Sequence, residues 1–235
     1  MKLGIIGAMD VEVATLKEAM TARVERTIAG SLYCEGRLEG LPAVVVQCGV
    51  GKVNAALCVQ ALCDCYGVTH IVNTGIAGAL ANVLDIGDLV ISREAMYHDF
   101  DCHYINPNYS VGQVPGMSVR AFPADKELVE MAYAAADALC PGHVHIGVVA
   151  SGDQFVCRKE HKQTIIENTN ALCTEMEGAA IAHGAWRNGV PVVVIRAISD
   201  KADDSAEMDY PTFEAIAAKR CADVTKQMAK KLAGK

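Results

Sequence analysis

Short, almost wholly apolar runs alternate along this chain with longer segments in which apolar residues recur at helical spacing. The short runs predict strands at residues 3–8, 33–38, 43–48, 71–73, 88–92, 144–150 and 191–195. The longer segments predict helices at residues 10–20, 51–65, 125–139, 177–187 and 211–232. Apolar strands that alternate with helices are typical of an α/β fold with a largely parallel central sheet.

Residues 96–123 show no clear period and are rich in Tyr, His, Asn, Gly and Pro. A loop of this length inside a compact domain is usually functional or lies at an interface. No shift to linker-like composition, internal repeat or low-complexity tract divides the sequence. We therefore expect one domain that spans residues 1–235.

Composition narrows the possible classes of protein. Hydrophobic residues make up 51% of the 235 residues and charged residues 21%, so the chain can bury a large core and is not intrinsically disordered. The formal net charge of -7 disfavours nucleic-acid binding, which needs a basic surface. The ten cysteines are scattered and form no Cys-x-x-Cys pair, and the sequence has no secretory signal pattern, so we expect reduced thiols in a cytoplasmic protein. No apolar run reaches about 18 residues, so we expect no membrane span.

In open α/β sheets, ligands bind beyond the carboxyl ends of the strands, so the residues that follow each apolar run are candidates for a site. Four such segments carry polar or glycine residues: Asp10 with Glu12, residues 73–78, residues 151–155 and residues 196–200. A carboxylate pair at residues 175–177 precedes a predicted helix. We expect these segments to converge and to bring several carboxylates into one cleft.

Each segment also has a purely structural interpretation. Glu12 and Glu177 are acidic residues at predicted helix starts, where the helix dipole favours them. Asp200 suits an N-cap, and residues 74–78 suit a tight turn between a strand and a helix. The functional interpretation depends on all these segments taken together, because so many of them follow the carboxyl ends of predicted strands.

Several common signatures are missing from the sequence. Neither a Walker A motif nor a Gly-x-Ser-x-Gly elbow occurs, and no His and Cys residues have the spacing of a zinc site. Residues 49–54 lack the third glycine of a dinucleotide fingerprint. These gaps disfavour a serine hydrolase, a zinc protein and an NAD-linked reductase.

Six segments form a more specific combination: residues 4–9 with Glu12, 49–56, 73–78, 151–155, 175–177 and 196–200. Together they resemble the 5′-methylthioadenosine/S-adenosylhomocysteine nucleosidase family, and the resemblance extends over essentially the whole chain. It implies a nucleoside phosphorylase-like fold, in which a twisted mixed central sheet is flanked by helices. It also implies a homodimer that hydrolyses small adenine nucleosides in methionine salvage, with no metal and no organic cofactor.

The resemblance implies a role for each residue that carries the chemistry. Glu12 activates the attacking water, and Asp200, helped by Ser199, protonates N7 of the purine. Glu177 holds the ribose hydroxyls, and Met176 packs beneath the sugar. These residue types suit the reaction, because cleavage of an N-ribosidic bond builds an oxocarbenium-like sugar and an electron-rich leaving group. The place of Asp200 after a long apolar run favours the raised pKa that a proton donor needs near neutral pH.

The remaining substrate contacts are implied in the same way. Phe155 stacks on adenine, and the backbone of Val156 reads its Watson–Crick edge. Gly78 lies against the ligand, and Tyr210 lines the pocket for the 5′-alkylthio group.

The closest alternative is a purine nucleoside phosphorylase on the same fold. Phosphorylases of this kind hold phosphate with arginines, whereas the matching places here are residues 7–10 and Asn73. Phosphate would meet Asp10 and Glu12 instead, which favours water as the nucleophile. A nucleoside-binding protein without activity is a further alternative, although binding alone does not require three carboxylates.

Three departures from the family pattern bear on the 5′ substituent. Ile76 stands where these nucleosidases usually have Ser, and Tyr210 replaces a usual Phe. Residues 102–115 form a stretch slightly longer than the pattern, in the region that reaches across the dimer in this family. Related nucleosidases act on 5′-deoxyadenosine or on futalosine-type substrates, which stay open as alternatives.

Overall fold

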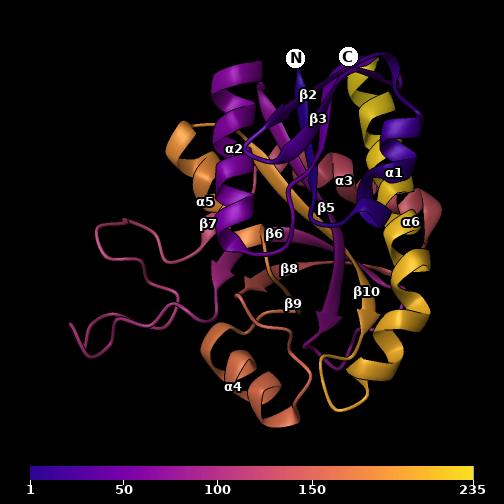
Figure 1. Ribbon diagram of the computed structural model, residues 1–235. Helices are drawn as coiled ribbons and strands as arrows, with labels where there is room; N and C mark the ends of the chain where they lie inside the picture. Colours follow the sequence, from indigo (N-terminus) through magenta and orange to yellow (C-terminus); the bar gives the residue numbers. More distant parts are fainter. Residues whose placement is uncertain (235) are drawn as a thin grey trace.

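One mixed sheet with helices on both faces forms the centre of the computed structural model, which describes residues 1–234 (Figure 1). The strands are β1 (Leu3–Gly7), β2 (Thr21–Ile28), β3 (Ser31–Leu38), β4 (Leu41–Gln47), β5 (His70–Ala79), β6 (Leu89–Tyr97), β7 (Phe122–Pro123), β8 (Val144–Ser151), β9 (Cys173–Glu175) and β10 (Val192–Asp200). The helices are α1 (Asp10–Glu18), α2 (Lys52–Tyr66), α3 (Lys126–Leu139), α4 (Lys159–Thr169), α5 (Gly178–Asn188) and α6 (Ala206–Ala233). The predicted α/β class with a mixed sheet is confirmed.

The strand order is β10-β6-β8-β9-β5-β1-β4-β3-β2, with β7 paired to β6. Because β10 pairs with β5 as well as with β6, the strands β5, β10, β6, β8 and β9 close into a ring. β1 lies outside this ring, between β5 and β4, and runs parallel to both. β2, β3 and β4 form an antiparallel extension of the sheet.

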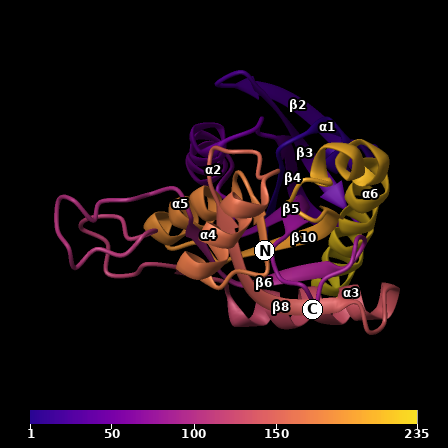
Figure 2. The ribbon, with the colours of Figure 1, turned by 90° about the horizontal axis from the view of Figure 1, so that it is seen from below.

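Helices cover both faces of the sheet, as Figures 1 and 2 show, and an apolar cluster lies on each face. α2 and α5 pack together on one face, where Ala55, Val59 and Ile181 belong to one buried cluster. α1, α3 and α6 cover the other face, where Val13 and Leu128 belong to a second cluster. None of the helices in the described part of the chain is long and apolar enough to cross a membrane.

The sequence pattern misses four elements, namely β2, β7, β9 and α4. Every side chain of β2 is exposed or half-buried, so this edge strand shows no apolar alternation. β7 and β9 contain only two and three residues. α4 buries only Ile165 and Thr169, which is too narrow a stripe to predict a helix.

β5 and β10 extend further than predicted, which corrects the turn expected at residues 74–78. These residues continue β5, are buried, and pair with β10 and β9. Two glycines in the segment suggested a turn, but pairing with β10 along the segment and with β9 at Gly78 overrides that preference. Asp200 likewise ends a strand and caps no helix, and α6 begins at Ala206, so that Pro211 lies inside the helix. Residues 98–121 form the predicted long loop, which projects from the body of the molecule in Figure 2.

A bulge in β2 generates a prediction about stability. Gly36 of β3 faces this bulge, where the register shifts between Thr21 and Val24. A Cβ atom at Gly36 would lie 2.6 Å from the carbonyl oxygen of Thr21, so the backbone would have to move. We expect Gly36→Ala to lower the melting temperature by several degrees, because overpacking costs about 1–3 kcal/mol, and each kcal/mol corresponds to about 2–4 °C in a chain of this size.

Thermal unfolding followed by circular dichroism checks this expectation. Thr27→Ala, an exposed substitution on the same edge strand, is the control and is expected to leave the melting temperature unchanged. An equal melting temperature for Gly36→Ala and the unaltered protein would contradict this account of the bulge.

Candidate active site

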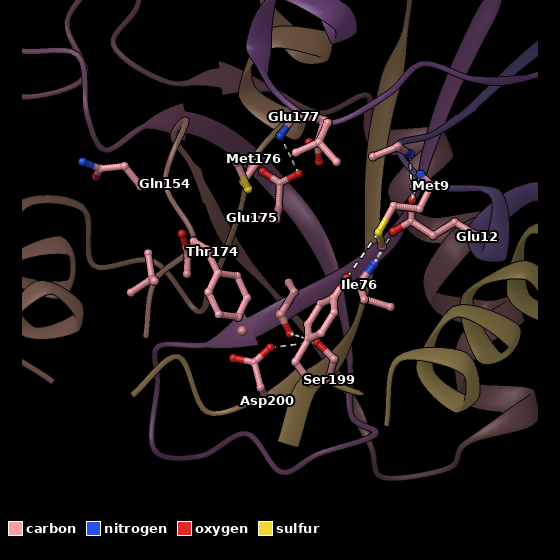
Figure 3. Close-up of a pocket in the computed structure, with 17 residues that line it drawn as sticks. Met9, Glu12, Ile76, Gln154, Thr174, Glu175, Met176, Glu177, Ser199 and Asp200 are labelled. Carbon is pink, nitrogen blue, oxygen red and sulfur yellow. Dashed lines mark hydrogen bonds between the residues drawn. The ribbon is translucent and has the colours of Figure 1, made fainter. Parts of the chain in front are cut away.

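A pocket with an empty volume of about 580 Å³ opens where the carboxyl ends of β1, β5, β8, β9 and β10 meet (Figure 3). Its lining includes every residue to which the resemblance assigns a role: Glu12, Gly78, Phe155, Val156, Met176, Glu177, Ser199, Asp200 and Tyr210. Ile76, one of the departures from the family pattern, lines it as well. Asp10, the other candidate carboxylate beside Glu12, is exposed and does not line the pocket. The strand ends thus converge on one cleft, as the α/β rule predicts.

Glu12, in the first turn of α1, is buried beside the pocket. Its Oε2 accepts hydrogen bonds from the backbone N–H groups of Ala8 at 2.6 Å and Met9 at 2.9 Å, and its Oε1 accepts one from Ile76 at 3.0 Å. Burial raises the pKa of Glu12, although the Arg196 guanidinium and these three N–H groups oppose the rise. Glu12 also has the structural role expected of an acidic residue at a helix start, because its carboxylate accepts a hydrogen bond from the otherwise free N–H of Met9 at the start of α1.

Asp200, at the end of β10, lies across the pocket from Glu12 in Figure 3. Its Oδ2 accepts a hydrogen bond from the Ser199 hydroxyl at 2.8 Å, and its Oδ1 accepts one from the backbone N–H of Ala202 at 2.8 Å. Burial raises the pKa of Asp200 and outweighs the lowering by these two hydrogen bonds. Asp200 therefore holds a proton at a higher pH than an ordinary aspartate.

Two glycines of β5 allow these carboxylates to approach the strand. A Cβ atom at Gly75 would lie 2.4 Å from Glu12 Oε1, and one at Gly78 would lie 2.7 Å from Asp200 Oδ1. Any larger residue at either position would displace a carboxylate. Gly78 thus contributes to the site by the absence of a side chain.

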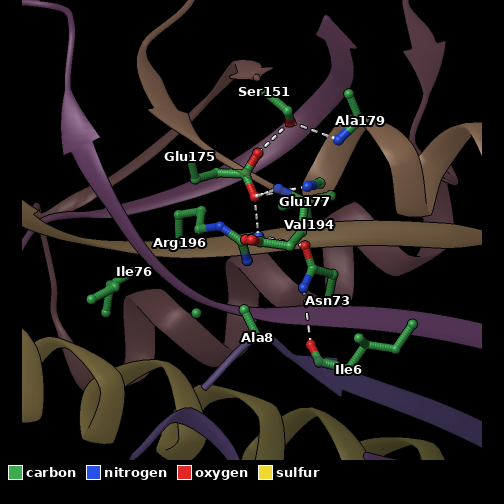
Figure 4. Close-up of polar contacts among 12 residues, drawn as sticks. Ile6, Ala8, Asn73, Ile76, Ser151, Glu175, Glu177, Ala179, Val194 and Arg196 are labelled. Atoms are coloured by element: carbon green, nitrogen blue, oxygen red, sulfur yellow. Dashed lines mark hydrogen bonds and ion pairs between the residues drawn. The ribbon is translucent and has the colours of Figure 1, made fainter. Parts of the chain in front are cut away.

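A buried ion pair lies next to the pocket (Figure 4). Arg196 of β10 donates to the carboxylate of Glu175 and, at 2.5 Å, to Oδ1 of Asn73. Asn73 in turn donates to the carbonyl of Ile6 at 2.9 Å, which ties the pair to β1. Burial lowers the pKa of Arg196, but the carboxylates of Glu175 and Glu12 raise it more, so the guanidinium stays charged.

Glu175 and Glu177 are neighbours in sequence but have different partners. Glu175 accepts from the Ser151 hydroxyl and from the N–H groups of Glu177 at 3.1 Å and Gly178 at 2.7 Å, so it orders the start of α5. Glu177 accepts instead from the N–H of Gly51 at 2.8 Å. Burial and the nearby charge of Glu175 raise the pKa of Glu177 to about 8.

Apolar and aromatic side chains form most of the remaining wall: Met9, Val50, Phe155, Val156, Met176 and Tyr210. The half-exposed ring of Phe155 meets Tyr210 edge to face, with centroids 5.6 Å apart and an interplanar angle of 84°. The Tyr210 hydroxyl lies 3.0 Å from Glu214 Oε1 and 3.2 Å from Met9 Sδ. An apolar cleft with aromatic rings and few polar groups suits a flat heterocycle with an apolar tail.

Sequence reasoning did not single out six further lining residues: Ala8, Met9, Val50, Ala77, Gln154 and Thr174. Each lies inside or directly beside one of the segments predicted to form the site, and this position in the sequence is the feature that could have identified it. Among residues 1–234, no group of three or more His, Cys, Asp or Glu side chains is arranged to hold a metal ion. The described lining holds carboxylates and neither lysine nor arginine, so the site can transfer protons and stabilise positive charge.

Comparisons with known proteins agree with this geometry. The family model described as the phosphorylase superfamily matches residues 2–230. The 5′-methylthioadenosine/S-adenosylhomocysteine nucleosidase of Geobacillus thermodenitrificans is 41% identical over 229 residues, which cover 97% of this chain and 96% of that protein. The crystal structure of the corresponding nucleosidase from Neisseria meningitidis, in complex with methylthio-immucillin-A, has a TM-score of 0.94 at 34% identity and covers 98% of this chain and 99% of its own.

A futalosine hydrolase of Helicobacter pylori is also similar, with a TM-score of 0.93, 31% identity and 98% coverage of both chains. Nucleosidases therefore match this chain in sequence and in structure along nearly its full length. The chain belongs to the phosphorylase superfamily and, within it, to the family of 5′-methylthioadenosine/S-adenosylhomocysteine nucleosidases.

Proposed function

We propose that this protein hydrolyses the N-ribosidic bond of 5′-methylthioadenosine and S-adenosylhomocysteine and releases adenine, as a step in methionine salvage. The observation that carries the proposal is the pair of buried carboxylates, Glu12 and Asp200, that face one pocket. The oxygen of a water molecule bonds to C1′ of the ribose while the bond from C1′ to N9 breaks. One proton passes from the water to Glu12, and another passes from Asp200 to N7 of the departing adenine.

Glu12 is the base in this scheme. Three backbone N–H groups hold its carboxylate, so its orientation is set before a substrate arrives. Its raised pKa also makes it a stronger base than an ordinary glutamate. Both properties support the assignment.

Asp200 is the acid. Protonation of N7 turns adenine into a neutral leaving group, and this step needs a carboxylic acid that keeps its proton near neutral pH. The raised pKa of Asp200 supports that role. Ser199, which donates to Oδ2, orients the carboxyl group.

The walls of the pocket supply the binding contacts. Phe155 stacks on adenine, and the backbone of Val156 reads the edge of the base. Glu177 binds the ribose hydroxyls above Met176, and Gly78 leaves room for the ligand. These assignments are supported by the position of all five residues around one cleft.

Tyr210, Met9 and Ile76 surround the place proposed for the 5′ substituent. Their surface is apolar apart from one hydroxyl, which favours an alkylthio group. The similarity to a futalosine hydrolase supports a second candidate, hydrolysis of a futalosine-type nucleoside by the same Glu12 and Asp200.

Water is the nucleophile in either case. The Arg196 guanidinium is buried and already bonded to Glu175 and Asn73, so it is not free to hold phosphate. An incoming phosphate would meet the carboxylate of Glu12, which is ionised when it acts as the base and therefore repels phosphate.

We further propose that the protein acts in the cytoplasm as a homodimer. The side chains of Val53 and Leu57 on α2 are 71% and 53% exposed, next to Val50 at the pocket. Tyr104 and Ile105 are also exposed, on the projecting loop after β6 (Figure 2). Clusters of exposed apolar side chains mark interfaces between proteins. Ten free thiols suit a reducing compartment.

We expect the purified protein to release adenine from both thio-nucleosides at the same rate with and without inorganic phosphate, as measured by chromatography. Glu12→Gln and Asp200→Asn are each expected to lower kcat by about 10²–10⁴-fold, because the amides cannot take or give the proton. Thr27→Ala, at a residue that does not line the pocket, is the control. A ribose 1-phosphate product would show phosphorolysis, and faster turnover of futalosine would favour the second candidate.

The dependence of kcat/KM on pH is expected to be bell-shaped. Glu12 must be ionised, so activity falls as the pH drops below its raised pKa; Asp200 must be protonated, so activity falls as the pH rises above its own raised pKa. The residual activity of Asp200→Asn should lack the alkaline limb, and that of Glu12→Gln the acid limb. Glu177→Gln, which changes a ribose contact, should keep both limbs. An alkaline limb that persists in Asp200→Asn would assign the acid to another group.

The proposed dimer predicts that Leu57→Glu dissociates it, because the substitution places a charge in an apolar interface. Size-exclusion chromatography with light scattering reports the mass. Ile216→Glu on α6, at a side chain that is also exposed, is the matched control and should remain dimeric. A wild-type protein that elutes as a monomer at micromolar concentration would refute the dimer.

A further inference from the structure

One lysine joins three loops beside the pocket without lining the pocket itself. Lys52 is the first residue of α2, Asp99 follows β6, and Asp153 follows β8. The Lys52 ammonium lies 2.7 Å from each carboxylate oxygen of Asp99 and 3.6 Å from Oδ2 of Asp153. Segments from three distant parts of the chain therefore meet at a single side chain.

Backbone hydrogen bonds also connect Lys52, Asp99 and Asp153. The N–H of Lys52 donates to Asp153 Oδ1 at 2.9 Å, and the N–H of Asp153 donates to Asp99 Oδ2 at 2.9 Å. Gly51, the N-cap of α2, has no side chain to cap the helix, so Asp153 supplies the acceptor from another loop. Each of the two carboxylates is thus held both by the ammonium and by an N–H group.

These three residues lie next to two parts of the binding pocket. Directly before Lys52, the N–H of Gly51 donates to Glu177 Oε1 at 2.8 Å. Directly after Asp153, residues 154–156 line the pocket. Lys52 and Asp153 are therefore each one residue away from a group that contacts or forms the site.

The environment strengthens these contacts. The side chains of Lys52 and Asp99 are only 22% and 16% exposed, so solvent screens their attraction less than at an open surface. Burial would raise the pKa of Asp99, but the hydrogen bonds from Lys52 and from the N–H of Asp153 outweigh it and lower the pKa. The ammonium also lies 5.4 Å from the centroid of the Tyr97 ring.

We infer that Lys52 is a positioning residue for substrate binding: through Asp99 and Asp153 it fixes the start of α2 against Glu177 and sets the segment 154–156 beside it. The inference rests on the proposed function, in which Glu177 binds the ribose and residues 155 and 156 bind the base. Glu12 and Asp200 take their hydrogen bonds from other residues. Loss of the lysine should therefore weaken binding more than the chemical step.

Lys52→Met removes the ammonium and keeps the apolar stem, whereas Asp99→Asn weakens the same contact from the other side. Either variant is expected to raise the KM for 5′-methylthioadenosine about tenfold, the effect of one lost hydrogen bond to a charged group, with kcat changed by less than about threefold. Lys52→Arg keeps the charge and should recover most of the affinity. The double variant Lys52→Met/Asp99→Asn should be no worse than Lys52→Met alone, because Lys52→Met already removes the contact that Asp99→Asn weakens.

Lys219→Met is the matched control, since this exposed lysine has a similar ion pair with Asp223 at 2.8 Å on α6. Calorimetric titration with adenine measures the affinity without turnover. If the wild type binds adenine but releases none from a nucleoside, the proposed function fails, and weaker adenine binding by Lys52→Met would still support the lysine's role. An unchanged KM and adenine affinity in Asp99→Asn and Lys52→Met would overturn the inference, whatever the melting temperature. So would a fall in kcat equal to the fall in kcat/KM.

Discussion

The buried ion pair between Arg196 and Glu175 makes this acidic pocket possible. A carboxylate is costly to bury without a partner, and the pocket gathers Glu12, Glu175 and Glu177 within reach of one guanidinium. Arg196 pairs with Glu175 directly, and its charge limits the rise that burial causes in the pKa of Glu12 and of Glu177. Carboxylates still outnumber the guanidinium, and an acidic cleft suits a reaction whose transition state places positive charge on a sugar.

The same ion pair also fixes the local structure. Glu175 accepts from N–H groups at the start of α5, and Ser151 bonds to Glu175 while it accepts from the N–H of Ala179 at 2.7 Å. Strands β8, β9 and β10 and helix α5 therefore meet in one polar cluster. The position of Glu177, which opens α5, depends on that cluster, so the charge balance and the geometry of the pocket have a common origin.

The sequence predicted the class of the fold and most of the lining of the site, because apolar strands and the polar residues at their ends are local patterns. It missed β2, which buries no side chain, and it took residues 74–78 for a turn, since glycine disfavours strands unless neighbouring strands pair with it. The partners of Glu175 and Lys52 could not be predicted. Both depend on which loops the closed ring of strands brings together, and a linear pattern does not contain that information.

The local structure around Glu12 and Asp200 is consistent with the opposite roles proposed for these two carboxylates. Glu12 lies at the start of α1, where three N–H groups and a nearby guanidinium stabilise its ionised form against burial. Asp200 ends a strand, receives one N–H and one hydroxyl, and faces the added negative charges of Asp209 and Asp203, which raise its pKa further. Three hydrogen-bond donors thus face the carboxylate of Glu12, whereas two face that of Asp200. The proposed base on the helix and the proposed acid on the strand are consistent with these different surroundings.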